Sequence, residues 1–209
     1  QLLWHYFNEL SIFVVYRAVF YTLLAKRSMP IDLIFSSMDR SSSDTIDRNE
    51  HFKKLVTQPI VAKYFLNHFA PFKGAGIQIE KFDLKHYHIR VKMPLTWQNR
   101  NIVGVHFGGS LYAMVDPFYM TLLMHHLGNK YIVWDKAASI QFLSPGRSTV
   151  YADFHLDAQE IATVKQLADN YAPVHRIYTL NIYDEAGIRI AEVEKTLYIR
   201  RKKPKPAQL

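Results

Sequence analysis

The chain has 209 residues, no cysteine and a formal net charge of +8. A hydrophobic fraction of 49%, with 13 tyrosines and 13 phenylalanines, excludes a disordered chain and predicts a globular protein with a large aromatic interior. Without cysteine there is no disulfide framework, thiolate metal site or cysteine nucleophile, which is compatible with the cytoplasm. The positive charge favours an anionic partner, but part of this charge is concentrated in the last ten residues. We expect these residues to form a solvated tail that does not bind nucleic acid.

The first fifty residues differ from the rest. Residues 2–25 are mostly apolar, but Glu9 and Arg17 interrupt them, which disfavours a membrane-spanning helix. We favour a helix packed on the protein or on a partner subunit over a helix on a membrane surface, and hence a cytoplasmic protein with membrane association as the alternative. Because the chain opens on Gln1, we expect the numbering to begin within a longer product. Residues 1–50 are predicted to be a helical extension and linker.

From residue 51 onward, hydrophobic periodicity predicts a regular succession of elements. In chain order these are a helix over 52–69 interrupted at Pro59 and closed by Pro71, Gly74 and Gly76, a hairpin over 77–93, an apolar helix over 107–127, strands over 131–143 and 149–156, a surface helix over 158–170 that Asp157 could cap, and strands over 174–184 and 188–199. The fold class is therefore α+β, with one antiparallel sheet wrapped around one long central helix. We assign residues 51–201 to this domain and 202–209 to the basic tail.

One carboxylate, Asp116, stands among apolar residues of the predicted central helix. An ionised carboxylate in an apolar interior is costly unless it is paired or hydrogen-bonded, so such a residue is often functional. Gly108 and Gly109 begin this helix and leave backbone N–H groups free to face an anion. The structural alternatives are that Pro117 marks a kink in the helix and that the glycines only permit close packing.

The stretch Asn101-Ile-Val-Gly-Val-His-Phe-Gly-Gly109, then Asp116, then Phe142-Leu-Ser-Pro-Gly146 resembles the hotdog-fold acyl-CoA thioesterases of the phenylacetyl-CoA thioesterase type. The resemblance covers about residues 52–201. It implies that two protomers join their sheets, with active sites at the dimer interface. It also implies that Asp116 is the helix acid, Gly109 the glycine whose N–H polarises the thioester carbonyl, and Asn101 the upstream asparagine. The family's block ends His-Gly-Gly, whereas here His106 stands one place earlier.

The expected activity is therefore hydrolysis of an acyl-CoA or other acyl-carrier thioester. Asp116 would activate water or attack as the nucleophile, the N–H of Gly109 would hold the oxyanion, and Asn101 and His106 complete the candidate catalytic set. Further substrate-binding candidates are Phe107, Gly108, Ser110, Tyr112, Tyr119, Lys136 and Arg147. Lys136, Arg147 or the C-terminal basic run would meet the phosphates of coenzyme A, and apolar residues around Asp116 would line an acyl tunnel.

Three other interpretations bear on function. A non-catalytic acyl-chain or lipid-binding protein could use the same scaffold, and a 3-hydroxyacyl thioester dehydratase could use His106 with an acid. His86 with His88, and His125 with His126, could suggest a metal, but no third ligand is evident and adjacent helical histidines point apart. We therefore expect no metal, no cofactor apart from the coenzyme A of the substrate, and self-association as a dimer or tetramer.

Overall fold

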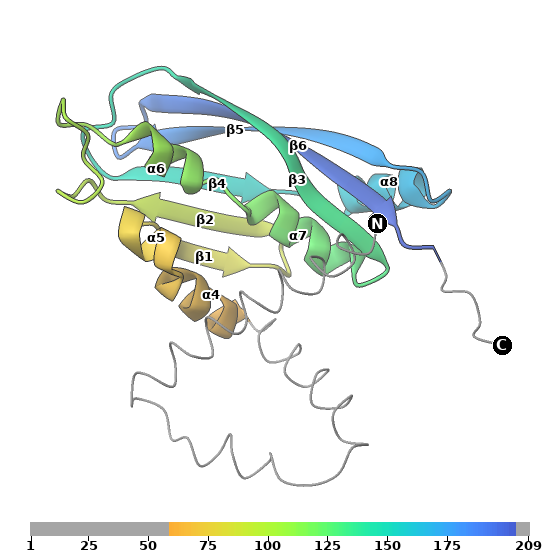
Figure 1. Cartoon of the computed structure of the whole chain (residues 1–209). Coiled ribbons are helices and arrows are strands. Elements are labelled where there is room, and N and C mark those ends of the chain that lie inside the picture. Colours follow the sequence, from red (N-terminus) through yellow and green to blue (C-terminus); the bar gives the residue numbers. More distant parts are fainter. Residues whose placement is uncertain (1–58, 204–209) are drawn as a thin grey trace, which may run out of the picture. The chain divides into compact units, whose positions relative to one another are not determined.

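The computed structural model describes residues 59–203 (Figure 1). The chain divides into two compact units, Gln1–Gln58 and Pro59–Leu209, and the described residues all belong to the second. The predicted extension and linker of residues 1–50 lie outside the described residues, as does the tail from residue 204 onward.

The described residues form helices and one antiparallel sheet. The helices are α4 (Pro59–His68), α5 (Ala70–Ala75), α6 (Gly108–Ala113), α7 (Phe118–Leu127) and α8 (Ala158–Ala168). The strands are β1 (Gln78–Asp83), β2 (His88–Met93), β3 (Tyr131–Phe142), β4 (Val150–His155), β5 (Val174–Asp184) and β6 (Arg189–Arg201). The sheet has six strands in the order β1-β2-β4-β5-β6-β3, so β1 and β3 are its edges. The predicted α+β hotdog arrangement is confirmed.

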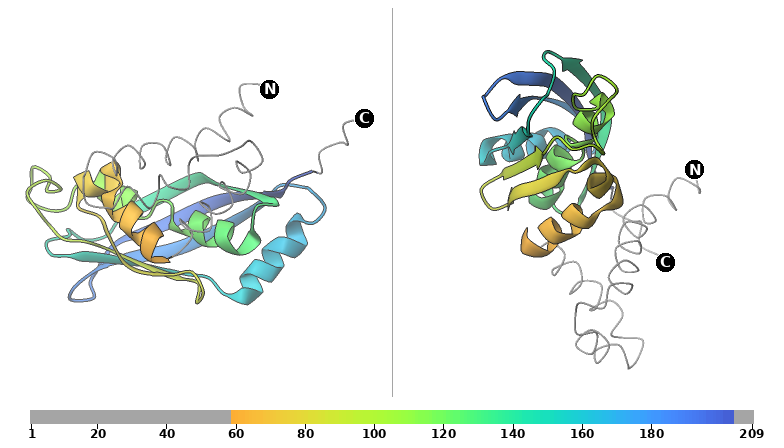
Figure 2. Two further views of the ribbon diagram at one scale, coloured as in Figure 1. Left: turned by 90° about the horizontal axis from the view of Figure 1, so that it is seen from below. Right: turned by 90° about the vertical axis from the view of Figure 1, so that its left-hand side faces the viewer.

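The central helix is divided in two. α6 ends at Ala113, α7 begins at Phe118, and residues 114–117 between them are not helical. Proline lacks the N–H that would continue the helical hydrogen bonds, which accounts for a break at Pro117. The predicted kink is therefore present, and it places Asp116 at a helix junction. α7 packs on β3 and β4, and the right-hand view of Figure 2 shows the strands curving around it.

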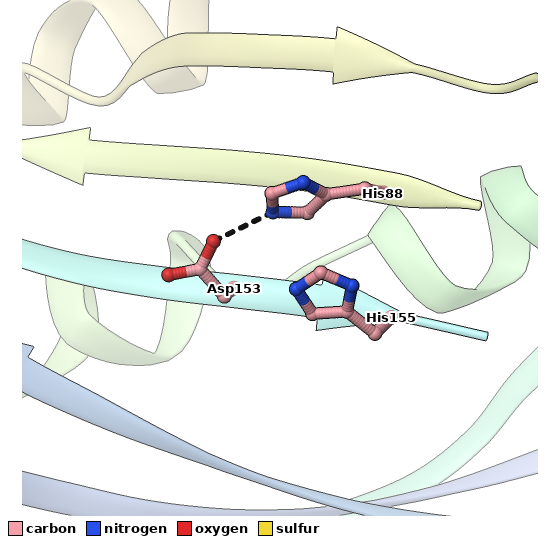
Figure 3. A group of neighbouring side chains, drawn as sticks. All are labelled: His88, Asp153 and His155. Atoms are coloured by element: carbon pink, nitrogen blue, oxygen red, sulfur yellow. Dashed lines mark hydrogen bonds and ion pairs between the residues drawn. The ribbon is translucent and has the colours of Figure 1, made fainter. Parts of the chain in front are cut away.

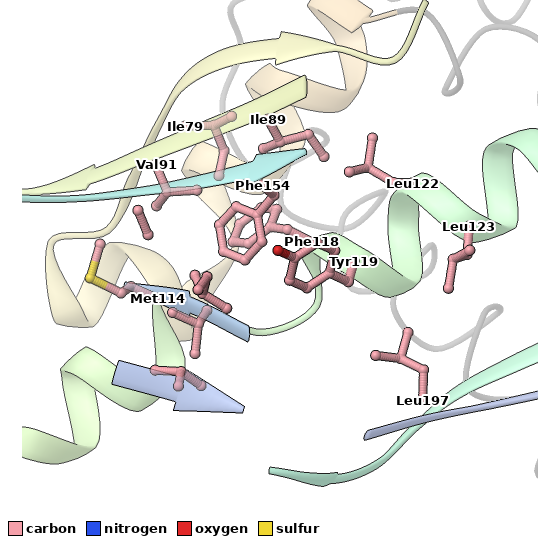
Figure 4. Packing of buried hydrophobic residues seen from close by; sticks show 14 of the residues in the cluster. Ile79, Ile89, Val91, Met114, Phe118, Tyr119, Leu122, Leu123, Phe154 and Leu197 are labelled. Carbon is pink, nitrogen blue, oxygen red and sulfur yellow. The ribbon is translucent and has the colours of Figure 1, made fainter. Parts of the chain in front are cut away.

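The core fills the space between this helix and the sheet (Figure 4). Phe118 of α7 packs against Phe154 of β4 with ring centroids 5.0 Å apart, and neither side chain is exposed. Met114, Leu122 and Leu197 are also fully buried. Each such side chain removed from water contributes about 1.5–3 kcal/mol, so packing against the helix gives the sheet its curvature and fixes its inner face.

Local sequence signals account for the ends of several elements. The side chain of Asp157 accepts a hydrogen bond of 2.7 Å from the N–H of Glu160, so it caps α8 as predicted. The β5–β6 turn uses Gly187 at φ 78°, a conformation that glycine adopts at low cost. The expectation that Pro71 ends the first helix is wrong. Pro71 lies in the first turn of α5, where a missing N–H is tolerated, and Gly76 ends that helix at φ 75°.

No helix within residues 59–203 is long and apolar enough to cross a membrane. The predicted helix over residues 2–25, with its possible membrane contact, lies outside the described residues.

Candidate functional site

The break between α6 and α7 presents Asp116 to solvent. Its side chain is 53% exposed, and its N–H donates to the carbonyl of Ala113 at 3.3 Å, closing the last turn before the break. On the other side, the carbonyl of Pro117 accepts hydrogen bonds from the N–H and the hydroxyl of Thr121, which begins α7. The expectation of a carboxylate in an apolar interior is therefore wrong, because the helix break brings Asp116 to the surface.

The buried charge at this place is Lys195 of β6. Its side chain is only 3% exposed, and its Nζ lies 3.3 Å from Oδ1 of Asp116 and 3.1 Å from Oδ1 of Asp135. It stands on the inward side of β6 between the buried Val193 and Leu197. Burying an ammonium is costly unless it is paired, so two carboxylates at one end of Lys195 are what allow it to remain there.

Asp135 of β3 completes a group of three charges that we call the Lys195 cluster: Asp116, Asp135 and Lys195. The Asp135 side chain is 20% exposed. The pKa of its carboxyl is raised to about 6, first by burial and then by a hydrogen bond and charge repulsion from Asp116, while Lys195 opposes these effects.

Sequence reasoning missed both Lys195 and Asp135 as members of this site. A signal for Lys195 exists, because β6 alternates buried and exposed residues and the lysine falls on the buried side. A register shift between Asp135 and Ala137 lets Asp135 face inward, and periodicity alone does not reveal such a bulge.

The start of α6 leaves backbone donors available. Within the described part of the chain, the N–H groups of Gly108 and Gly109 donate to no acceptor, whereas those of Ser110 and Leu111 both bond to the carbonyl of Phe107. A Cβ at Gly109 would collide with the ring of Phe107, and one at Gly108 would lie 2.9 Å from the ring of Phe142. A larger residue at either position would therefore require the exposed ring of Phe107 or Phe142 to move.

Asparagine side chains hold the loop that precedes α6. Oδ1 of Asn101 accepts from the N–H groups of Val103 and Val105, so this oxygen shapes the loop. Asn99, which the sequence did not single out, is 1% exposed and bonds to the backbone of Ala75, Pro94 and Thr96. Its carbonyl also accepts from the N–H of Phe107, so Asn99 ties the loop to the helix start.

His106 is buried beside the β3–β4 loop. Its Nε2 lies 2.9 Å from the carbonyl oxygen of Ser148, to which it donates as the neutral ring. Burial lowers the pKa of His106, and its Nδ1 is buried without a hydrogen-bond partner in the described chain. No carboxylate within the described residues pairs with it.

The remaining candidate residues differ in how far their side chains are exposed. Phe107 and Tyr112 are exposed, whereas Ser110 is buried. Tyr119 is 5% exposed in the core, where burial raises its pKa to about 12 and its ring stacks on that of Tyr178 at 4.8 Å. The residues predicted to line an acyl tunnel, Met114, Phe118, Tyr119 and Met120, all belong to the core or pack against it.

Basic candidates lie on the surface. Nζ of Lys136 is 3.0 Å from Nε2 of His175, and Arg147 is exposed in the β3–β4 loop. Near the end of β6, Lys130, Arg201 and Lys202 contribute to a surface pocket of about 380 Å³.

The antiparallel sheet around a central helix makes this a hotdog-fold protein. The chain belongs to the family described as Domain of unknown function (DUF4442), whose model matches residues 57–199. A search of curated proteins finds no match.

Solved structures with the same fold include proteins named as thioesterases. A protein of unknown function and probable thioesterase, PA5026 from Pseudomonas aeruginosa, is 20% identical with a TM-score of 0.61, covering 68% of this chain and 95% of that one. Thioesterase HI1161 from Haemophilus influenzae is 18% identical with a TM-score of 0.52, covering 69% and 91%. A mutant of thioesterase PA1618 from P. aeruginosa is 14% identical with a TM-score of 0.53, covering 70% and 96%. At these identities the likeness shows the fold.

Proposed function

We propose that this protein hydrolyses an acyl-CoA or other acyl-carrier thioester. The observation that carries the proposal is the Asp116 carboxylate, exposed at the break in the central helix and paired with the buried Lys195. Asp135 adds a second carboxyl whose pKa is raised to about 6. The names of the structural neighbours support the same class of reaction, and the resemblance to phenylacetyl-CoA thioesterases makes phenylacetyl-CoA the first substrate to test.

In the proposed reaction, Asp116 takes a proton from water while the water oxygen bonds to the thioester carbonyl carbon. The resulting oxyanion accepts a hydrogen bond from the N–H of Gly109, a contribution of about 3 kcal/mol by analogy with other hydrolases. The C–S bond then breaks, and the leaving thiolate takes the proton from the Asp116 carboxyl, which gives free acid and thiol. As the alternative, Asp116 attacks the carbonyl and displaces the thiolate, and water hydrolyses the mixed anhydride.

The Lys195 cluster explains how such a carboxylate would be held. Lys195 cannot move far because it is packed between core residues of β6, so its ammonium is a fixed anchor for Asp116. Fixed charges that need no reorganisation during the reaction are an efficient form of electrostatic catalysis. We assign Lys195 a positioning role. Asp135 is assigned the role of a neighbouring carboxyl that can hold a proton beside Asp116. Asn101 and His106 would support the loop that leads into Gly109.

Coenzyme A would use the basic surface. Arg201 lies six residues beyond Lys195 on β6, so the two are roughly 20 Å apart along the strand. A pantetheine arm spans a distance of this order, which would bring its phosphates to the pocket of Lys130, Arg201 and Lys202. Lys136 and Arg147 are the other candidate phosphate contacts.

We also propose that the protein self-associates as a dimer or tetramer. β3 is a 12-residue edge strand that pairs with β6 on one side only within the described residues. A long unpaired edge is a template for another chain, and a second copy would extend the sheet at the strand that carries Asp135.

Thiol release from a series of acyl-CoA esters, including phenylacetyl-CoA, tests the activity. We expect turnover by the full chain and a fall in kcat of at least about 100-fold in Asp116→Asn and Asp116→Ala. Glu185→Gln, which alters an exposed carboxylate in the β5–β6 turn, should keep full activity. Full activity in Asp116→Ala would refute the mechanism. A protein that binds acyl-CoA but turns over no chain length would instead be the acyl-binding alternative. Within residues 59–203, His106 contacts no acid of the kind that the dehydratase alternative would use.

A further inference from the structure

Three side chains able to bind a metal meet on the outer face of the sheet (Figure 3). His88 of β2 pairs in register with His155 of β4, and Asp153 lies two residues earlier on β4. Side chains two residues apart on a strand share a face, so all three belong to one face. Their neighbours Ile89 and Phe154 are fully buried on the face toward α7.

The three side chains are already close together. Nε2 of His88 lies 2.7 Å from Oδ1 of Asp153, and the His88 and His155 rings stack with centroids 3.9 Å apart. One ligand atom from each residue lies within 4.8 Å of the other two. Tetrahedral zinc at about 2.0–2.1 Å from each ligand separates the ligand atoms by roughly 3.4 Å. Metal binding therefore requires the most distant pair to approach by no more than about 1.4 Å and the His88–Asp153 pair to separate by about 0.7 Å. His155 is exposed, and its side chain makes no hydrogen bond within residues 59–203 that metal binding would have to break.

We propose that His88, Asp153 and His155 bind a divalent transition metal of the Zn²⁺ type. Two imidazoles and one carboxylate are a ligand set that such metals favour, and three protein ligands leave a position for water. The sequence offered His86 and His88 without a third ligand. The fold supplies Asp153 and His155 from the neighbouring strand.

The open coordination position would adjoin a pocket. β4 and β5 pair only as far as Ala152 and Ile182, and beyond that point they separate. A surface pocket of about 340 Å³ lies there, and Asp153, His155 and Asn181 line it. Oδ1 of Asn181 is buried and has no hydrogen-bond partner within the described residues. The pocket therefore gives a bound metal access to water or a small ligand, with one amide oxygen ready to accept a hydrogen bond.

Arg90 opposes the metal. Its Nη1 lies 3.3 Å from Oδ2 of Asp153, so it shares the negative charge that a cation would use. The other carboxylate oxygen, Oδ1, is hydrogen-bonded to Nε2 of His88, and a metal bound between these two atoms would replace that hydrogen bond. Glu80 holds Nε of Arg90 at 2.9 Å, which offsets part of the arginine charge. Removing this arginine should therefore strengthen metal binding, an effect that a simple ion-pair network would not produce.

The experiment uses the full chain without a histidine tag, stripped with a chelator and titrated with Zn²⁺ against a chromophoric competitor. Co²⁺ provides a visible spectrum that reports coordination. We expect the wild type to bind one metal ion per chain. His155→Gln and His88→Gln should each lower the affinity at least about 100-fold, because the loss of an outer-shell partner alone lowers metal affinity 10–100-fold. Arg90→Gln should bind more tightly. His86→Gln, which alters an exposed histidine on the turn beside β2, is the matched control and should bind as the wild type does.

Circular dichroism of each variant shows whether the sheet is retained. His155→Gln is the decisive variant, because His155 has no hydrogen bond to lose within the described residues. The absence of stoichiometric binding by the wild type would overturn the proposal. Equal binding by His155→Gln, His86→Gln and the wild type would also overturn it, and would assign the cluster to an ion-pair network alone.

Discussion

The Asp135→Asn substitution tests the Lys195 cluster through the pH dependence of stability. Asparagine resembles the protonated carboxyl but cannot ionise, so the variant escapes the cost that the fold imposes on the charged form. The surroundings of Asp135 raise its pKa from 3.8 to about 6. At roughly 1.36 kcal/mol for each pKa unit, this difference makes the ionised form about 3 kcal/mol less favourable in the folded state than in the unfolded chain.

The sign follows from the two pKa values. The folded wild type is free of this cost below about pH 4 and carries all of it above about pH 6.5, because the unfolded chain ionises first as the pH rises. The free energy of unfolding of Asp135→Asn, relative to the wild type, should therefore rise by about 2 kcal/mol between pH 4.5 and pH 8. The remaining part of the 3 kcal/mol develops below pH 4.5.

Urea denaturation of the full chain, followed by tryptophan fluorescence at several pH values, measures this difference. Asp169→Asn is the control, because Asp169 is 58% exposed and pairs with Arg201 at the surface. Its stability relative to the wild type should stay nearly constant over the same range. A flat profile for Asp135→Asn, or one that falls as the pH rises, would refute the reasoning that burial and Asp116 together penalise the Asp135 carboxylate.

Four further substitutions test other parts of the structure. Lys195→Met leaves the carboxylates of Asp116 and Asp135 without their cation, so it should lower the free energy of unfolding by about 2–4 kcal/mol at pH 8, as measured by urea denaturation. A loss under about 0.5 kcal/mol would contradict the pairing. Asn99→Ala removes three buried hydrogen bonds and should lower the free energy of unfolding by about 2–3 kcal/mol, whereas Asn101→Ala should lower it by about 1 kcal/mol. Thermal unfolding measures both losses, and a larger loss for Asn101→Ala than for Asn99→Ala would contradict this expectation. Asp157→Ala should cost about 1 kcal/mol and speed hydrogen exchange in the first turn of α8, so unchanged exchange would exclude the cap.

Local periodicity was enough to predict the sheet and most helix positions. The alternation in β2 and β6 is strong because one face of each strand is buried in the core and the other faces outward. The missed helix α5 shows the limit of local signals. Pro71 reads as a terminator in isolation, but a helix that begins one residue earlier accepts it.

The site was only partly predictable, because its residues are joined by strand order. Asp116 stood out in the sequence, but its partner Lys195 lies 79 residues later. Likewise, His88 and Asp153 are 65 residues apart and meet because β2 and β4 are neighbours in the sheet. The alternation within a strand indicates on which face of the sheet a residue lies, but it does not indicate which strand is its neighbour. Clusters formed by residues of different strands therefore cannot be predicted from this alternation.

The two clusters lie on opposite faces of the sheet, and this separation has a physical consequence. Lys195 points inward with Val193 and Leu197, whereas His88 and His155 point away from the buried Ile89 and Phe154. A metal ion on the outer face and the carboxylates on the inner face are thus separated by the sheet and by packed core side chains. The two clusters share no residue, so substitutions at Asp116 and at His155 should have additive effects on stability.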